Sequence, residues 1–448
     1  MTSTDLYRDH LAALDRWLAD SLERAGRRGV SLDGVLFHAG RERTYHADDN
    51  AIAFWSTPHF RRWCPIAGPE HIVLARPGGR VQVVRVRPMD FWFDTSMPPA
   101  SYWESVVDLS EAESFEKAAE SLGSLERIAY VGDAPEAAQA VGIDADRIEP
   151  AELMAPLDWY RAYKTPWEVA LTEVAVRRAA SGHLAGLEMF RAGATEREIH
   201  WAFLEGSDQI EREVPFNTIV ALEEKGAVLH YERKRGPEAA PGRTLLLDAG
   251  ASFEGYASDL TRTWVGEGAD PVFKELVEGV DALEQELVAM VAPGVPYPDI
   301  HQAAHRGVAQ ILQRTGVVKV SADEAMERGL TRHFFPHGVG HHLGIQVHDV
   351  GGHQAGPDGG EVAPPAEYPL LRTTRPLEAG HLVTIEPGIY FNPVLLDPVR
   401  GSDDASAIDW AVVDCLRPFG GVRIEDDVLC TENGARDLSR EHLPGPRE

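Results

Sequence analysis

The sequence predicts an α+β protein of two domains, and three observations support this fold class. The chain has 448 residues, more than the roughly 250 to 300 that one hydrophobic core usually serves. Short strand-like segments alternate with amphipathic helical stretches. A strong helix start lies near residue 165, beyond which the pattern of elements changes. We therefore expect a smaller mixed α/β domain over residues 1–160 and a larger α+β domain over residues 161–448.

The smaller domain is expected to begin with a helix and to continue with short strands. Apolar residues recur at helical spacing from Tyr7 to Leu22, and Gly26 ends the pattern. The predicted strands cover residues 34–38, 72–75, 81–86 and 128–131. The segment after Val131 lacks the G-x-G-x-x-G pattern of a nucleotide-binding loop, so we interpret it as a plain strand-to-helix turn.

The larger domain is expected to open on a helix over residues 166–191. Thr165 and Glu168 form a T-x-x-E capping box around its start, and a second box at Thr195 begins the next helix. Strands are then predicted at residues 217–222, 244–249, 257–265, 382–386 and 422–429, and helices at residues 271–291 and 297–314. Residues 351–369, rich in Pro and Gly, are interpreted as a long loop. The pattern does not order the strands within a sheet.

The composition is that of a soluble protein of the reducing cytoplasm. Hydrophobic residues make up 44% and charged residues 25% of the chain. No apolar run approaches the roughly 20 residues of a membrane span, and the first residues lack the apolar core of a signal peptide. Cys64, Cys415 and Cys430 are too few and too widely spaced for a disulfide framework or a Cys-based zinc site.

The formal net charge of -28 excludes nucleic acid as an expected partner, because phosphate contacts need clustered Lys and Arg. An acidic excess is compatible with solubility alone. It is also compatible with carboxylates that assemble around cations.

The segment PHGVGHHLGIQVHDV, residues 336–350, holds four histidines. His337 and His341 stand at i and i+4, the spacing by which a helical H-E-x-x-H motif binds zinc. Two glycines between them each weaken a helix by about 1 kcal/mol, and no Glu fills the base position. We therefore expect a loop or bent strand, from which at most one or two histidines face a given point. The remaining ligands of any metal must come from elsewhere.

Four acids end or interrupt apolar segments, where an ordinary surface explanation is weak: Asp248 in TLLLDAG, Asp259 in YASDLTRTW, Glu386 in LVTIEPG and Glu425 in FGGVRIEDDVL. A buried carboxylate needs a cation or hydrogen-bond donors. Period-2 alternation places Asp259 on one strand face with Thr261 and Thr263. Arg423 shares a face with Glu425 and can hold its carboxylate. Each acid alone could instead form a salt bridge or cap a turn.

Taken together, four such acids and a histidine-rich loop predict a metal centre. Four carboxylates and one imidazole can hold two divalent ions with a water between them, whereas a single structural zinc favours Cys and His. Oxygen-rich ligation with one nitrogen suits manganese or cobalt better than copper.

At these positions the sequence resembles the pita-bread-fold metallopeptidases, and most closely the bacterial proline dipeptidases. The resemblance covers nearly the whole chain and is strongest from about residue 214, through VPFNTIVAL, AVLHY, LLLDAG, GYASDLTRTW, PHGVGH, LRTTR, TIEPGIYF and PFGGVRIEDDV. It implies a pita-bread C-terminal domain with a smaller N-terminal domain that serves dimerisation and closure of the substrate site. One departure is His342, where bacterial relatives commonly have Pro.

The resemblance also implies the metals and the roles of the site residues. It implies two Mn²⁺ ions per subunit, with Co²⁺ or Zn²⁺ as substitutes. The implied ligands are Asp248, Asp259, His341, Glu386 and Glu425, of which Asp259 and Glu425 each meet both metals. Substrate-side or supporting roles fall to His230, Tyr231, His337 and Arg423. Arg372 is expected to grip the substrate carboxylate, and Asp49 to be lent to the active site of a partner subunit.

The implied activity is hydrolysis of Xaa-Pro dipeptides by a cytoplasmic homodimer. Glu386 is expected to act as the base for a water shared by the metals, and His348, with His337 nearby, to act at the scissile bond. The nearest alternative is an aminopeptidase P that acts on longer Xaa-Pro-Yaa peptides. A non-catalytic peptide-binding protein on the same fold is an alternative of another class. Hydrolysis of organophosphate triesters is expected at most as a side activity.

Overall fold

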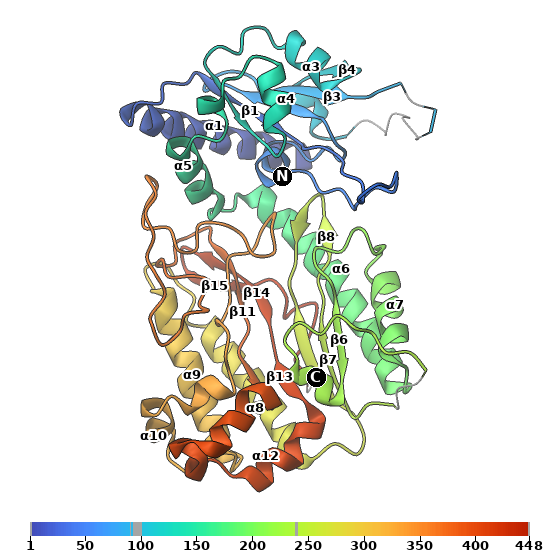
Figure 1. The fold of residues 1–448 in the computed structure, drawn as a ribbon, viewed down its shortest axis with the longest axis vertical. Coiled ribbons are helices and arrows are strands. Elements are labelled where there is room, and N and C mark those ends of the chain that lie inside the picture. The colour runs from blue at the N-terminus through green and yellow to red at the C-terminus, as the bar shows by residue number, and fades with distance from the viewer. Residues whose placement is uncertain (1, 90, 93–100, 238–240, 447–448) are drawn as a thin grey trace. The chain divides into compact units, whose positions relative to one another are not determined.

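A computed structural model describes residues 2–89, 91–92, 101–237 and 241–446, and its chain divides into two compact units (Figure 1). Unit 1 comprises Met1–Leu171 and Gln354–Gly360. Unit 2 comprises Thr172–His353 and Glu361–Glu448. Part of the loop predicted at residues 351–369 therefore belongs to unit 1, which no feature of the sequence pattern indicated.

Unit 1 is built on one five-stranded sheet of order β4-β3-β2-β1-β5. Its strands are β1 (Gly34–His38), β2 (Ile72–Ala75), β3 (Gln82–Val86), β4 (Asp108–Ala112) and β5 (Ile128–Val131). Its helices are α1 (Ser3–Arg27), α2 (Pro58–Trp63), α3 (Phe115–Ser121), α4 (Pro135–Ala140) and α5 (Ala151–Arg161). The four strands predicted here are confirmed. Strand β4 was missed because its sequence, DLSEA, is polar, as an edge strand can be.

Helix α6 (Pro166–Arg191) begins with the predicted capping box. The backbone N–H of Thr165 donates to Glu168 Oε2 at 2.9 Å, and the backbone N–H of Glu168 donates to Thr165 Oγ1 at 3.4 Å. The second predicted box, at Thr195, starts α7 (Glu196–Gly206). Both helix starts are thus confirmed, because each cap satisfies N–H groups that the first helical turn leaves free.

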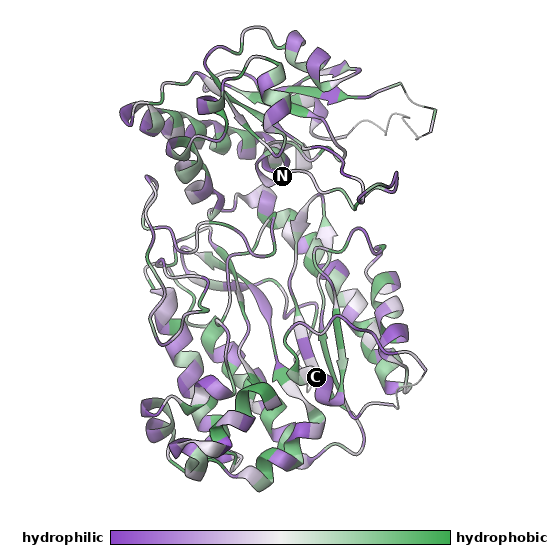
Figure 2. Ribbon diagram, viewed as in Figure 1, coloured by the Kyte–Doolittle hydropathy of each residue, from purple (hydrophilic) through white to green (hydrophobic). Residues whose placement is uncertain are grey.

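Unit 2 contains two three-stranded antiparallel sheets, and helices flank both of them (Figure 1). The first sheet has the order β10-β7-β6, with β6 (Ile219–Leu222), β7 (Thr244–Asp248) and β10 (Thr261–Val265). In Figure 2 strands β6 and β7 are green over most of their length, whereas the neighbouring α7 alternates green and purple. This is the pattern of a buried sheet covered by an amphipathic helix.

The second sheet has the order β11-β14-β15, with β11 (Leu382–Ile385), β14 (Asp426–Thr431) and β15 (Gly434–Asp437). Two short pairs complete the strands, β8 (Ser252–Phe253) with β9 (Tyr256–Ala257), and β12 (Gly388–Tyr390) with β13 (Gly421–Arg423). The larger hydrophobic core of unit 2 joins this sheet to α8 and α9 through side chains such as Leu283, Val308 and Val383. The remaining helices are α8 (Pro271–Val288), α9 (Tyr297–Arg314), α10 (Ala322–Glu327), α11 (Pro393–Leu396) and α12 (Trp410–Leu416). No helix among the described residues is long and apolar enough to cross a bilayer.

Two strands that the sequence predicts as continuous are interrupted. The predicted strand 257–265 breaks between β9 and β10, and the predicted strand 422–429 breaks between β13 and β14. At the first break the backbone N–H of Asp259 donates to the side-chain carboxylate of Asp427 at 3.2 Å and not to a backbone carbonyl. At the second, the N–H of Glu425 donates to the carbonyl of Thr261 at 3.0 Å. Two predicted ligands therefore stand at breaks, where continuous alternation had placed them on regular strand faces.

Candidate metal centre

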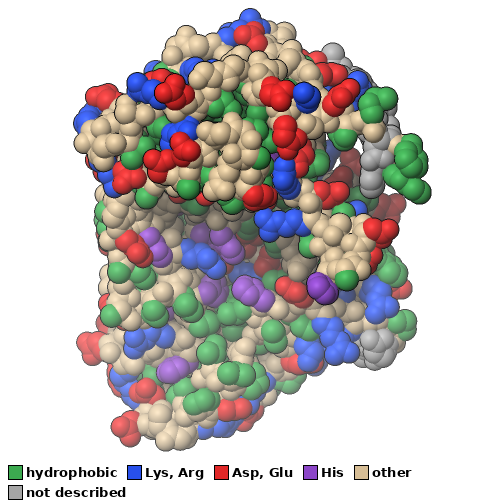
Figure 3. All heavy atoms as spheres, turned by 45° about the horizontal axis from the view of Figure 1, so that its top comes forward, with side chains coloured by type: hydrophobic (Ala, Val, Ile, Leu, Met, Phe, Trp, Pro, Cys, Tyr) green, Lys and Arg blue, Asp and Glu red, His purple; other side chains and the backbone are tan. Residues whose placement is uncertain are grey.

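One cavity of unit 2, of ≈ 840 Å³, collects most of the predicted site residues. Its lining includes all five predicted ligands: Asp248, Asp259, His341, Glu386 and Glu425. It also includes the predicted substrate-side and supporting residues His230, His337, His348, Arg372 and Arg423. Figure 3 shows histidine side chains, in purple, gathered at a recessed part of the surface. Residues far apart in the sequence thus meet at one place.

Three of the predicted ligands lie within reach of a single ion. One ligand atom from each of Asp259, His341 and Glu425 lies within 4.8 Å of the other two. His341 Nε2 is 3.5 Å from Asp259 Oδ2 and 3.7 Å from Glu386 Oε1. Asp248 stands at the end of β7, directly opposite Thr261 in the neighbouring strand. The fold therefore brings the carboxylates of Asp259, Glu386 and Glu425, from three chain segments, close to one imidazole nitrogen.

His341 is held with its Nε2 pointing at the carboxylates. Its Nδ1 is 3.0 Å from the carbonyl of His342, so Nδ1 carries the proton and Nε2 presents a lone pair. Its backbone N–H donates to Thr384 Oγ1 at 3.1 Å. The preceding Gly340 lies so close to β11 that a Cβ would come within 2.0 Å of the Thr384 carbonyl oxygen. The segment is a loop, as predicted, and its glycine permits this approach.

His342 contributes its backbone carbonyl to the orientation of His341. Its own ring is buried and lies edge-on to His381, with ring centroids 5.0 Å apart. The side chain that departs from the family pattern therefore faces the protein interior and does not line the cavity.

Arg423 links several of the site residues. Its guanidinium donates to the carboxylate of Asp248, to the hydroxyl of Tyr390 at 3.0 Å and to Thr261 Oγ1 at 3.1 Å. Thr261 Oγ1 in turn donates to Glu425 Oε2 at 2.6 Å. Arg423 therefore holds Asp248 directly, whereas it reaches the expected partner, Glu425, chiefly through the threonine.

The Tyr390 hydroxyl extends this network to His337. It lies 2.8 Å from His337 Nε2, and His337 Nδ1 lies 2.8 Å from the carbonyl of Gly338. Nδ1–H therefore donates to the carbonyl, and Nε2 accepts from the tyrosine. Burial, followed by the nearby positive charge of Arg423, lowers the pKa of His337 to about 3 and keeps it neutral. Sequence analysis did not single out Tyr390, although its place four residues after Glu386 in the TIEPGIYF motif is a signal that could have found it.

The electrostatics of the cavity call for added positive charge. Burial, and then neighbouring carboxylates, raise the pKa of Asp248 to about 6 and that of Glu386 to about 7, although Arg423 and His341 oppose the shift. Burial and the charges of Asp259 and Glu386 also raise the pKa of Glu425 well above its usual range. Asp248 Oδ1 is buried and has no hydrogen-bond partner among the described residues. Divalent cations would satisfy these oxygens, so the donor set fits them.

The remaining cavity wall offers surfaces for an organic ligand. The His348 ring lies edge-on to that of His341, with centroids 4.4 Å apart. Partial burial, followed by the charges of His341 and Arg372, lowers the pKa of His348 and keeps it neutral. Phe216 and the exposed Leu370 add apolar wall. These two were not predicted, because a single apolar residue beside a loop carries no distinctive sequence signal.

Two predicted residues lie away from the cavity wall. The Tyr231 hydroxyl donates to buried Glu196 Oε2 at 2.9 Å, and Tyr231 is not among the lining residues. Asp49 belongs to unit 1, where it is exposed in a loop closed by the bridge between Thr44 and Ala51. Their expected roles at the substrate stay predictions.

Fold and site together define a metal-dependent hydrolase. Residues 170–432 match metallopeptidase family M24, and residues 5–159 match the N-terminal domain of Xaa-Pro dipeptidase. The chain belongs to metallopeptidase family M24, whose members carry a dinuclear centre of divalent metal ions, and is therefore a hydrolase.

Similar sequences carry the name Xaa-Pro dipeptidase. The protein of that name from Pseudoalteromonas atlantica is 39% identical over 445 residues, which cover 97% of this chain and 98% of the relative. That from Escherichia coli O157:H7 is 37% identical, with 97% and 98% of the two chains covered.

Solved structures of aminopeptidase P share the fold. A variant of the Escherichia coli enzyme in complex with substrate superposes with a TM-score of 0.74 at 21% identity, over 100% of this chain and 97% of that one. Pseudomonas aeruginosa aminopeptidase PepP gives 0.69 at 22% identity, over 95% of each chain. At this identity the likeness establishes the pita-bread fold, as the resemblance implied.

Proposed function

We propose that this protein is an Xaa-Pro dipeptidase that uses two Mn²⁺ ions, held by Asp248, Asp259, His341, Glu386 and Glu425. The observation that carries the proposal is the match of residues 5–159 to the N-terminal domain of Xaa-Pro dipeptidase. The fold alone does not discriminate between an Xaa-Pro dipeptidase and an aminopeptidase P, because aminopeptidase P shares this fold. The full-length similarity to Xaa-Pro dipeptidases adds support.

When bound, the two cations supply Lewis-acid activation of a water molecule and of the scissile carbonyl. Glu386 is the group that moves the proton. Its carboxylate lies at the cavity wall, where, once ionised, it can accept the proton of the attacking water. It can then release that proton to the proline nitrogen as the peptide bond breaks.

His348 and Arg372 act on the substrate from the cavity wall. Because His348 is neutral, one ring nitrogen can donate a hydrogen bond to the oxygen that becomes negative during attack. Arg372 binds the free carboxylate of the proline residue in a bidentate pair. Because this contact requires a free carboxylate on the proline residue, it selects dipeptides over longer peptides. The positive charge of Arg372 also explains how a protein with a net charge of -28 binds an anionic group.

The proposal includes a cytoplasmic homodimer in which Asp49 approaches the active site of the partner subunit. Three free cysteines, at Cys64, Cys415 and Cys430, are compatible with a reducing compartment. Sedimentation equilibrium of the purified protein tests the dimer. If Asp49→Ala left KM and kcat unchanged, the role of that residue would be wrong.

The decisive experiment compares turnover of Xaa-Pro dipeptides, Xaa-Pro-Yaa tripeptides and a phosphotriester. The protein is loaded in turn with Mn²⁺, Co²⁺ and Zn²⁺. We expect the highest kcat/KM on Xaa-Pro dipeptides with Mn²⁺. Faster turnover of Xaa-Pro-Yaa tripeptides than of dipeptides would identify an aminopeptidase P. Faster turnover of a phosphotriester than of dipeptides would show that organophosphate hydrolysis is not a side activity. Dipeptide binding without turnover in every metal form would identify a binding protein.

A further inference from the structure

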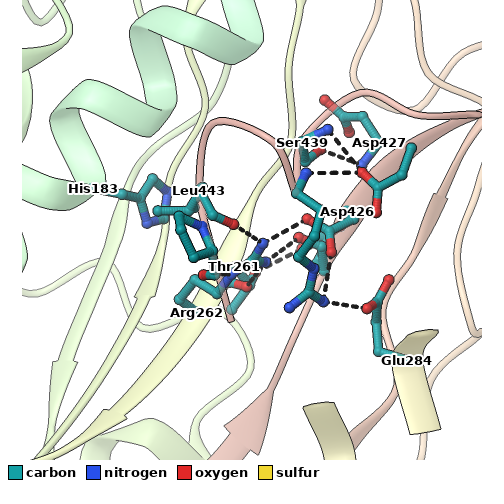
Figure 4. Close-up of polar contacts among 12 residues, drawn as sticks. His183, Thr261, Arg262, Glu284, Asp426, Asp427, Ser439 and Leu443 are labelled. Atoms are coloured by element: carbon teal, nitrogen blue, oxygen red, sulfur yellow. Dashed lines mark hydrogen bonds and ion pairs between the residues drawn. The ribbon is translucent and has the colours of Figure 1, made fainter. Parts of the chain in front are cut away.

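Behind the metal centre lies Arg262, a fully buried arginine on β10 whose guanidinium uses all of its donors (Figure 4). Nε donates to the carbonyl of Pro444 at 3.1 Å. Nη1 donates to the carbonyls of Thr261 at 3.0 Å and Glu425 at 2.9 Å. Nη2 donates to Asp426 Oδ1 and to the carbonyl of Leu443, each at 2.7 Å. Since a guanidinium has five N–H bonds, no donor is left for another partner.

These five acceptors come from three separate chain segments. Thr261 and Glu425 belong to the segments that carry the proposed ligands, and the Thr261 hydroxyl donates to Glu425 Oε2. Leu443 and Pro444 belong to a stretch that we call the 439–444 segment. Leu443 is buried in the core that covers β7 and β10. Arg262 therefore ties the backbone of a ligand to a segment that has no part in the cavity wall.

A second connection runs from the same segment to Asp259. Ser439 Oγ accepts the backbone N–H of Asp427 at 2.8 Å. The Asp427 carboxylate accepts the backbone N–H of Asp259 at 3.2 Å. Ser439 and Asp427 are both fully buried. The 439–444 segment thus reaches both of the ligands that are proposed to meet both metals, by two independent routes.

Arg440 supplies a third contact, next to Glu425. Its guanidinium donates to the carboxylate of Glu284 and lies 2.8 Å from Asp426 Oδ2. Glu284, Asp426 and Asp437 also lie close enough together to hold a metal ion. An arginine side chain already contacts two of the three, however, so this acidic cluster is neutralised from within the chain. Asp426 stands between Arg262 and Arg440 and is fixed from both sides.

We propose that Arg262 and the 439–444 segment position Glu425 and Asp259 for metal binding, as a layer behind the cavity. The inference rests on the proposed function for the identity of the ligands. Buried carboxylates that repel one another do not stay in ligating geometry unaided, so their backbones need fixed partners. Loss of the layer should lower metal affinity and distort coordination, with the fold retained.

The test measures metal binding and not turnover. Arg262→Lys keeps one positive charge beside Asp426 but offers three donors in place of five. Ser439→Ala is the milder variant and removes only the acceptor for the Asp427 N–H. The matched control is Arg436→Lys, on β15 of the sheet that contains β14, whose partly exposed guanidinium pairs with Glu173. Mn²⁺ affinity is measured by calorimetry, coordination by the visible absorption spectrum of the Co²⁺ form, and folding by circular dichroism of the metal-free protein.

We expect Arg262→Lys to weaken Mn²⁺ binding about 10- to 100-fold. Ser439→Ala should weaken it about three- to tenfold, the loss of one buried hydrogen bond. Both should change the Co²⁺ spectrum, while Arg436→Lys matches the parent in both measurements. If Arg262→Lys does not fold, the Mn²⁺ affinity and Co²⁺ spectrum of Ser439→Ala test the inference alone.

Parental Mn²⁺ affinity and a parental Co²⁺ spectrum in folded Ser439→Ala, or in folded Arg262→Lys, would overturn the inference, because a purely structural role changes only the unfolding transition. A parent protein that binds no divalent cation would overturn it as well. A parent that binds Mn²⁺ but hydrolyses no dipeptide would contradict the proposed function and leave this inference standing.

Discussion

At the scale of single residues, the proposed metal centre combines four carboxylates with the guanidinium of Arg423 and the imidazole of His341. Arg423 partners Asp248, and the Thr261 hydroxyl partners Glu425. These contacts satisfy some lone pairs and leave others, such as those of the buried Asp248 Oδ1, without a hydrogen-bond partner among the described residues. In the proposed centre, removal of any one carboxylate would change both the number of ligands and the negative charge that holds the cations.

Asp259→Asn should abolish binding of at least one metal ion per subunit. An amide oxygen carries no charge and cannot bridge two cations as a carboxylate can. Metal content after gel filtration, measured by atomic absorption, should fall and turnover should fall with it. Full metal content with near-parental turnover would show that Asp259 is not a bridging ligand.

Arg372→Ala should raise KM for Xaa-Pro dipeptides and leave metal content unchanged. Truncation removes a charge-assisted pair with the substrate carboxylate, which is worth about 1.5 to 3 kcal/mol, or about 10- to 100-fold in KM. Arg372→Lys serves as the matched control and should raise KM less than Arg372→Ala does. Lysine keeps the positive charge but cannot form the bidentate pair that a guanidinium forms with a carboxylate. Loss of metal from Arg372→Ala would instead place this residue among the metal-binding groups.

The sequence predicted which acids gather, but it did not predict how the chain presents them. Strand-end positions in apolar segments singled out Asp248 and Glu386, and the resemblance added their roles. Alternation then placed Asp259 and Glu425 on continuous strands, whereas the structure interrupts both strands at these residues. The interruptions depend on partners far away in the sequence, such as Asp427 for the N–H of Asp259. No local pattern contains that information.

At the scale of elements, one loop is anchored to a helix beside the cavity. The Tyr368 ring stacks on His305 of α9, with centroids 4.6 Å apart, and meets His301 edge-on at 4.5 Å. The backbone N–H of Leu371 donates to the Tyr368 carbonyl at 3.1 Å. The residue after Leu371 is Arg372, so the stacked tyrosine holds the turn that presents this arginine to the cavity.

Tyr368→Ala should therefore raise KM for dipeptides about as much as Arg372→Ala does, with little change in kcat. In the double variant, the loss of binding free energy calculated from KM should be smaller than the sum of the two single losses. Both residues act on one contact, that of Arg372 with the substrate carboxylate. Tyr368→Phe keeps the stacked ring and is expected to behave as the parent. Equal KM values for the alanine variant and the parent would show that the turn holds its shape without the tyrosine.

At the scale of the whole molecule, the raised carboxylate pKa values link stability to metal and pH. Asp248 and Glu386 have pKa values of about 6 and about 7 in the metal-free fold, above the ordinary 3.8 and 4.5. The folded state then binds more protons than the unfolded state at intermediate pH. The free energy of unfolding of metal-free protein should consequently fall as pH rises from about 4 to about 7.

Metal binding requires these carboxylates to be ionised, so stabilisation by Mn²⁺ should increase over the same range. We expect a larger Mn²⁺-dependent gain in the free energy of unfolding at about pH 7.5 than at about pH 5, measured by urea denaturation with and without the ion. Asp259→Asn supplies the control, in which most of the gain should disappear. An equal gain at both pH values would mean that the carboxylates are already ionised in the metal-free fold.

The division into units shows where sequence patterns stop being informative. Local signals located most helices and strands, because each depends on periodicity and caps within a few residues. The assignment of Gln354–Gly360 to unit 1 depends on contacts with residues more than a hundred positions away. Among them, Arg24 pairs with Asp358 at 3.0 Å, and Gln354 Nε2 donates to the carbonyl of Ala155 at 2.6 Å.

That assignment has a consequence for cleavage of the chain. The polypeptide passes from one unit to the other three times, after Leu171, after His353 and after Gly360. A protease that cut once near Leu171 would leave residues 354–360 on the C-terminal product, where they would still pack against the N-terminal product in unit 1. An N-terminal fragment that ended near Leu171 would lack residues 354–360, which complete unit 1. Limited proteolysis should therefore release a separate N-terminal piece only after cuts at several places.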